Sequence, residues 1–198
     1  MSRPYVQKRR AEAAEATRRR IAQAAMELHG TIGPARTTIS AVAERAGVQR
    51  LTVYRHFADE TALFEACSGH WLSLNPPPDP GLWADGETRE ERLQRALGTV
   101  YAFYERTADM LRNVLRDAPG VPALSGPVAE WRRYLDRARD AAVRASGQGD
   151  TDRLLLAAAG HALAFETWNS LRDHGFAHQE AVNLMVALVV AAPSTTRV

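Results

Sequence analysis

The chain has 198 residues, of which 45% are hydrophobic and 24% charged, and its net charge at pH 7 is +2. These proportions are typical of a globular protein and exclude an intrinsically disordered chain. No apolar run reaches the roughly 18 residues that a membrane span needs, and a single cysteine, Cys67, excludes an intramolecular disulfide framework. Because no apolar signal core follows the basic N-terminus, we expect a cytoplasmic protein without a membrane partner.

The charge is divided unevenly along the chain. Residues 1–57 carry a net charge of +7, whereas residues 58–198 carry −5. A basic front on an acidic remainder indicates a polyanionic partner for the front alone. The alternative is that these cations form a solvated tail, and charge by itself does not separate the two interpretations.

Helical periodicity recurs along the chain, and no segment shows the convincing alternation of a β-strand. We expect about nine helices, at residues 12–30, 39–46, 49–56, 60–74, 87–106, 110–115, 128–145, 152–174 and 178–192. Proline-rich and glycine-rich stretches separate several of them. The expected fold is therefore all-α, with a three-helix N-terminal domain over residues 1–57 and a helical C-terminal domain over residues 58–198.

Residues 38–57, TISAVAERAGVQRLTVYRHF, predict two short helices joined by a tight turn. Gly47 suits the turn because glycine accepts a positive φ, and either Thr37 or Thr38 can cap the first helix. This pattern is that of a helix-turn-helix motif. The apolar residues expected to fix the angle between the two helices are Ile39, Val42, Ala43, Val48, Val53 and Phe57.

The second helix of this motif turns mostly polar side chains outward, and in helix-turn-helix proteins that helix enters the major groove of DNA. Arg50 has the fork that matches guanine, Gln49 can pair with adenine, and Leu51 can contact a thymine methyl group. Tyr54 and His56 are better suited to phosphates. The expected DNA-binding residues are Thr38, Gln49, Arg50, Leu51, Thr52, Tyr54, His56 and, in the basic N-terminal arm, Arg10.

The stretch from Arg36 to Leu63 resembles the DNA-binding domain of the TetR family of bacterial one-component regulators. The family pattern runs roughly T-x-x-x-I-A-x-x-A-G-V-S-x-G-T-L-Y-x-H-F-x-S-K-x-x-L. It is matched at Thr38, Val42, Ala43, Ala46, Gly47, Val48, Thr52, Val53, Tyr54, His56, Phe57 and Leu63. The resemblance implies a homodimeric transcription regulator, by default a repressor, that binds an operator in double-stranded DNA and responds to a small-molecule effector.

Three residues depart from the family pattern. Gln49 stands where serine is usual, so the recognition helix lacks a common N-cap. Leu51 stands where a small residue is common, and Glu60 stands where the family usually has lysine. An acid at position 60 repels DNA unless its side chain is turned away.

The C-terminal domain contains a segment crowded with alanine and glycine, residues 154–171, followed by a segment that is apolar on more than one side, residues 178–192. Such a helix needs burial on several faces. Together with the resemblance, this predicts a two-fold homodimer through the eighth and ninth helices. The alternative is burial of both helices within one subunit.

Aromatic residues and a few polar residues recur on the helices of the C-terminal domain. A mostly apolar pocket with a few polar groups suits a hydrophobic or aromatic effector. The alternative is that the aromatic residues form an ordinary core. The expected ligand-binding residues are Trp71, Phe103, Tyr104, Trp131, His161, Phe165, Trp168 and Asn169.

Two other classes of function remain as alternatives. One is a constitutive DNA-binding dimer without an effector. The other is an α-helical enzyme, which is disfavoured because the sequence has no paired metal ligands, glycine-rich phosphate loop, nucleophile elbow or cysteine nucleophile signature. We therefore expect no catalytic residues, no metal and no cofactor.

Overall fold

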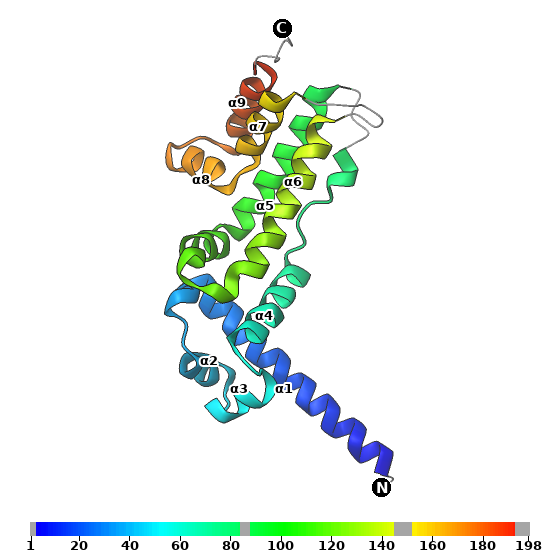
Figure 1. Cartoon of the computed structure of the whole chain (residues 1–198), viewed down its shortest axis with the longest axis vertical. Helices are drawn as coiled ribbons and strands as arrows, with labels where there is room; N and C mark the ends of the chain where they lie inside the picture. The colour runs from blue at the N-terminus through cyan, green and yellow to red at the C-terminus, as the bar shows by residue number, and fades with distance from the viewer. Residues whose placement is uncertain (1–2, 84–87, 145–151, 193–198) are drawn as a thin grey trace. The chain divides into compact units, whose positions relative to one another are not determined.

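The computed structural model describes residues 3–83, 88–144 and 152–192 (Figure 1). Within these ranges the chain forms nine α-helices and four short 3-10 helices and contains no strand. The α-helices are α1 (Arg3–Thr31), α2 (Ile39–Ala46), α3 (Arg50–His56), α4 (Glu60–Leu74), α5 (Arg89–Asp117), α6 (Ser125–Val143), α7 (Arg153–Leu163), α8 (Phe165–Asp173) and α9 (His178–Val190). The 3-10 helices are η1 (Pro34–Arg36), η2 (Pro80–Trp83), η3 (Ala118–Gly120) and η4 (Pro122–Leu124). The expected all-α fold is confirmed.

Two expected helix boundaries in the middle and at the start of the chain are wrong. Helix α1 begins at Arg3 rather than near Glu12, so the basic arm is helical. Helix α5 runs unbroken from Arg89 to Asp117, where two helices were expected. Nothing breaks α5 because the intervening residues include no glycine or proline and the hydroxyl of Thr107 donates to the backbone oxygen of Phe103, 2.7 Å away.

The long helix expected over residues 152–174 is also wrong, because the chain breaks at Ala164. This residue has an extended conformation (φ −66°, ψ 141°), and α7 and α8 lie on either side of it. The merged and divided helices cancel, which leaves the expected number of helices unchanged. The ends expected at Glu87 and Ala145 lie outside the described residues.

The described residues form two compact units. The first comprises residues 3–76 and 109–128, and the second comprises residues 77–83, 88–108, 129–144 and 152–192. Helix α5 contributes to both units, and α4 packs on α1 within the first. The expected division into an N-terminal domain over residues 1–57 and a C-terminal domain over residues 58–198 is a division by function, and it stays a prediction. No helix in the described ranges is long and apolar enough to span a membrane.

The core of the first unit is built on an apolar stripe of α1. Ile21, Ala25 and Leu28 are buried at helical spacing and pack against α2 and α4. Leu63 of α4 and Leu124 of η4 complete the same cluster. This core places α2 and α3 on α1, and it thereby sets which face of α3 remains exposed.

Candidate nucleic-acid interface and effector site

The expected helix-turn-helix is present, and its turn depends on Gly47. This residue lies in the left-handed region (φ 63°, ψ 40°), where a side chain is disfavoured. Its N–H donates to the oxygen of Glu44, and the N–H of Val48 donates to that of Ala43. These bonds satisfy carbonyl groups that the end of α2 leaves unpaired, and they direct the chain into α3.

The N-termini of the two helices of the motif are capped differently. The hydroxyl of Thr38 accepts from the N–H of Ala41, 3.2 Å away, so Thr38 rather than Thr37 caps α2. Gln49 occupies the N-cap position of α3 and makes no side-chain capping bond. The carboxylate of Asp59 caps α4 by accepting from Ala62, 2.8 Å away. Glu60 is exposed in the first turn of α4, where the helix dipole favours an acidic side chain.

Helix α3 has one buried face and one exposed face. Val53 and Phe57 are buried against the core of the first unit. On the exposed face, Leu51 and Tyr54 retain 59% and 49% of their accessible surface. Two large side chains so exposed on a short helix indicate a surface that contacts a partner. The polar residues beside them are Gln49 and Arg50, which are exposed, and Thr52 and His56, which are half-buried.

The basic arm continues the positive charge of this surface along α1. Lys8, Arg9 and Arg10 are exposed on the helix before its first buried residue, Ile21. Exposed cations on a helix fit the sugar-phosphate backbone of DNA rather than its bases. Arg10 is exposed on α1, and its expected contact with DNA stays a prediction.

In the second unit, most of the expected ligand-binding aromatic residues come together around Tyr104. Its ring centroid lies 5.3 Å from that of Phe165 and 5.7 Å from that of Trp168. The rings of Phe103 and Trp131 each lie 6.1 Å from it. These five residues, contributed by α5, α6 and α8, are called the aromatic cluster below.

Two further tyrosines lie in this region. Tyr134 stacks on Trp131 with a centroid distance of 5.0 Å, and its hydroxyl donates to the oxygen of Pro78, 3.0 Å away. Tyr101 lies one helical turn before Tyr104 and its ring is 6.3 Å from it. The spacing of three residues from Trp131 and from Tyr104 is the signal that indicates a shared helix face.

The hydroxyl groups of Tyr101 and Tyr104 satisfy the end of α7. They donate to the oxygens of Ala162, 2.8 Å away, and Leu163, 2.6 Å away. The break at Ala164 leaves these carbonyl groups without partners in the helix, so the buried tyrosines replace the missing bonds. Burial raises the pKa of both hydroxyl groups, which remain protonated donors.

The remaining expected ligand-binding residues are placed less uniformly. The indole nitrogen of Trp168 is buried and has no hydrogen-bond partner among the described residues. His161 is exposed, while Asn169 is half-buried and donates to Asp173, 2.9 Å away. Trp71 lies on α4 in the first unit and is half-buried there.

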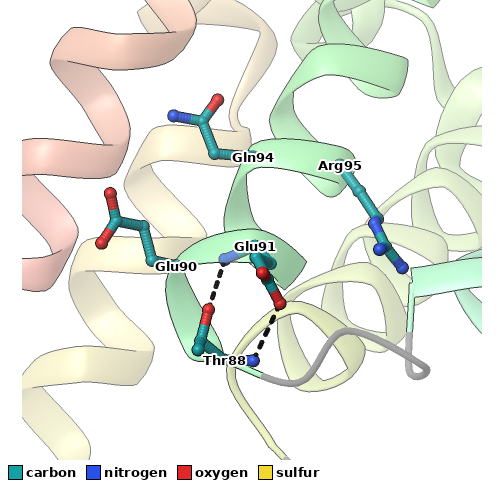
Figure 2. A pocket seen from close by; sticks show the side chains of 5 residues that line it. All are labelled: Thr88, Glu90, Glu91, Gln94 and Arg95. Atoms are coloured by element: carbon teal, nitrogen blue, oxygen red, sulfur yellow. Dashed lines mark hydrogen bonds between the residues drawn. The ribbon is translucent and has the colours of Figure 1, made fainter.

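An open pocket of about 400 Å³ lies at the first turns of α5 (Figure 2). The N–H of Glu91 donates to the hydroxyl of Thr88, and the N–H of Thr88 donates to the carboxylate of Glu91, each over 3.1 Å. This reciprocal pair is a capping box, so these polar groups stabilise the helix end. The lining residues are Thr88, Glu90, Glu91, Gln94 and Arg95, and none of them was expected to bind ligand.

An all-α chain that presents the second helix of a helix-turn-helix with its polar face exposed defines a class, the helix-turn-helix DNA-binding proteins. Residues 21–67 match the family model of bacterial regulatory proteins of the tetR family. The match covers the helix-turn-helix, the same part of the chain in which the sequence motif resembles that family.

The whole chain has the fold of solved TetR-family structures. It resembles a TetR-family transcriptional regulator of Mesorhizobium loti with 22% identity and a TM-score of 0.63, over 90% of this chain and 95% of that one. The regulator FadR of Bacillus subtilis, in complex with stearoyl-CoA, is 17% identical with a TM-score of 0.60, over 88% and 98% of the two chains. The multidrug-binding protein EbrR, in complex with imidazole, is 22% identical with a TM-score of 0.57, over 91% and 92%. A search of curated proteins finds no match.

Proposed function

We propose that this protein is a cytoplasmic, dimeric transcription regulator that represses genes by binding an operator and is released by a small hydrophobic or aromatic effector. The observation that carries the DNA-binding part is the division of α3 into a buried face, with Val53 and Phe57, and an exposed face, with Leu51 and Tyr54. An exposed leucine and tyrosine beside Arg50 are unfavourable if the outer face of α3 contacts only solvent. They are useful if that face enters a groove of DNA.

The exposed face divides into base-reading and phosphate-binding residues. Arg50 lies at the start of α3, where helix-turn-helix proteins contact base edges, and its fork matches O6 and N7 of guanine. Gln49 and Leu51 lie beside it. Thr52 also faces the bases, Tyr54, His56 and Arg10 bind phosphate, and Thr38 is a further DNA contact.

A second copy of the chain covers the apolar surface of α7 and α9. These helices pack on each other within the second unit, yet Leu188 and Val190 of α9 retain 56% and 49% of their accessible surface. Leu154 of α7 is exposed as well. A two-fold dimer that packs on α9 covers exposed apolar side chains of this kind and holds two recognition helices roughly 34–36 Å apart, one turn of DNA.

The aromatic cluster receives the effector. Trp168 is 4% exposed, and its indole N–H is an unpaired buried donor, which costs free energy until it meets an acceptor. An effector with an aromatic or aliphatic body and one acceptor atom satisfies it. The ligand-bound states of FadR and EbrR support a ligand site in this fold. Release from DNA follows if the effector prefers a different spacing of the recognition helices.

The test is selection of operator sequences from random DNA, repeated with a panel of effectors. Arg50→Ala is expected to relax base preference at one position of each half-site, and Arg10→Ala to reduce the salt slope by about one without changing preference. Salt-sensitive binding without an enriched sequence contradicts the proposal. An enriched operator whose affinity no ligand changes favours the constitutive DNA-binding dimer.

The effector site is tested with Trp168→Phe, which keeps an aromatic ring at this position but removes the indole N–H donor. For any effector found in the panel, the variant is expected to lose affinity for ligands that carry an acceptor and to keep it for apolar analogues. An equal change in affinity for both kinds of ligand, relative to the native protein, contradicts a role for the indole N–H.

A further inference from the structure

Helix α3 is short and has few internal means of holding its position. It has seven residues, and the side chain of its N-cap residue, Gln49, makes no capping bond. Helices of this length are not stable in isolation. The orientation of its base-reading residues therefore depends on contacts from the rest of the first unit.

Arg18 of α1 makes two such contacts at the C-terminal end of α3. Its guanidinium donates to the backbone oxygen of His56, the last residue of the helix. The same guanidinium lies over the ring of Phe57, with 4.2 Å between its central carbon and the ring centroid. A cation at a helix C-terminus is favoured by the helix dipole, and a cation over a ring by the ring quadrupole.

The two arginines that follow Arg18 do not share this position. Arg19 and Arg20 are exposed, whereas Arg18 is half-buried. Arg19 is paired with Glu15 of its own helix over 3.9 Å. Because successive residues of a helix point about 100° apart, only one of the three arginines faces α3, and the other two are matched controls.

We infer that Arg18 is a positioning residue of the recognition helix, which supports DNA sequence selection through α3 rather than by binding phosphate. This inference rests on the proposed binding of operator DNA. The carbonyl group that Arg18 holds belongs to the residue two places after Tyr54, and Phe57 anchors the same end in the core. If that end is released, Gln49 and Arg50 lose their fixed approach to the bases.

Lysine is the informative replacement at this position. It keeps the positive charge and can still bind a phosphate, but it lacks the planar fork that stacks on a ring while donating to a carbonyl group. A phosphate-binding role predicts that Arg18→Lys behaves like the native protein. A positioning role predicts that Arg18→Lys resembles Arg18→Gln.

The first measurement is amide hydrogen exchange of the full-length protein without DNA. Arg18→Gln and Arg18→Lys are expected to exchange about tenfold faster than the native protein at residues 53–57, because a charge-assisted bond is lost. Arg19→Gln and Arg20→Gln are expected to leave that segment unchanged. Native exchange rates in both Arg18 variants would overturn the inference.

The second measurement compares binding to a duplex that the native protein enriches from random DNA with binding to an unenriched duplex of equal length. Both Arg18 variants are expected to lower the affinity ratio about tenfold and to leave the salt slope on the unenriched duplex unchanged. The inference would be overturned if Arg18→Gln lowered the salt slope by one phosphate contact on both duplexes while Arg18→Lys bound both duplexes like the native protein. If the native protein enriches no sequence, the proposed function fails, and the expected effect of Arg18 on selectivity fails with it. If the native protein enriches a sequence but the Arg18 variants have native-like affinity ratios, only the role of Arg18 is refuted.

Discussion

The side-chain amide of Asn113 donates hydrogen bonds to the backbone oxygens of His29, 3.2 Å away, and Gly30, 2.9 Å away. Both acceptors lie in the last turn of α1, where carbonyl groups lack partners in their own helix. Asn113 is buried on the part of α5 that belongs to the first unit. One turn later, Asp117 accepts from the N–H of Ala35, 3.0 Å away. The end of α5 thus holds the segment that leads from α1 into the helix-turn-helix.

Replacement of Asn113 by alanine is expected to lower the free energy of unfolding by about 1–3 kcal/mol, since one buried and one half-buried carbonyl group lose their donor. Denaturant titration measures the loss. Asn183→Ala is the matched control, because that amide is exposed on α9, and its effect should stay within about 0.5 kcal/mol. Equal effects of the two substitutions would contradict the assignment.

The stability of the protein is expected to fall as pH decreases from about 6.5 towards 4, because of His29. Burial lowers the pKa of this residue from 6.5 to about 4, against a smaller opposing effect of Asp117. The unfolded state then binds a proton that the folded state does not, and stability is fully present only above pH 6.5. The loss from this group reaches about 3 kcal/mol near pH 4.

Denaturant titrations at a series of pH values check this dependence. His29→Gln removes the titrating group, so its stability is expected to change less between pH 6.5 and 4.5 than that of the native protein. Parallel curves for the two proteins would show that His29 does not titrate as the structure requires.

Cys67 is expected to react slowly with a thiol reagent in the folded protein at pH 8. Burial raises the pKa of its thiol to about 12, and the reactive species is the thiolate. A thiol placed on the exposed side of the same helix by Ser73→Cys, in a Cys67→Ser background, is expected to react rapidly. The reaction is monitored by the absorbance of the group that the reagent releases. Fast modification of Cys67 in the native protein would contradict its burial.

Removal of the Tyr104 hydroxyl by Tyr104→Phe is expected to destabilise the protein by about 1–3 kcal/mol, because the oxygen of Leu163 is left buried without a donor. Tyr54→Phe removes the same group from an exposed ring and should change stability by less than about 0.5 kcal/mol. Thermal or denaturant unfolding distinguishes the two. If Tyr104→Phe leaves stability unchanged, the break at Ala164 does not depend on the hydrogen bond from Tyr104 to Leu163.

A serine at position 49 is expected to stabilise the protein by about 1 kcal/mol, because it supplies the N-cap that α3 lacks. Gln49→Ala serves as the control, since it removes the glutamine without adding a cap and should give no gain. The two variants are compared by denaturant unfolding. If Gln49→Ser is no more stable than Gln49→Ala, the start of α3 is not limited by capping.

The helix-turn-helix was predictable because its determinants are close together in the sequence. The cap at Thr38, the left-handed turn at Gly47 and the buried spacing of Val53 and Phe57 all depend on neighbours within a few residues. The sequence therefore determined the fold class, the position of the motif and the outward face of α3. Helical spacing by itself also places Tyr101 and Tyr104, three residues apart in α5, on one face.

Tertiary structure alone decided the features whose partners are distant in the chain. The break at Ala164 has no glycine or proline to mark it, and the hydroxyl groups that satisfy it come from Tyr101 and Tyr104, 61 and 59 residues away from their acceptors. Arg18 resembles Arg19 and Arg20 in sequence, and only packing turns it towards His56, 38 residues later. A local pattern records which side of a helix is apolar, but the partner of a polar side chain is set by elements that meet only when the chain folds.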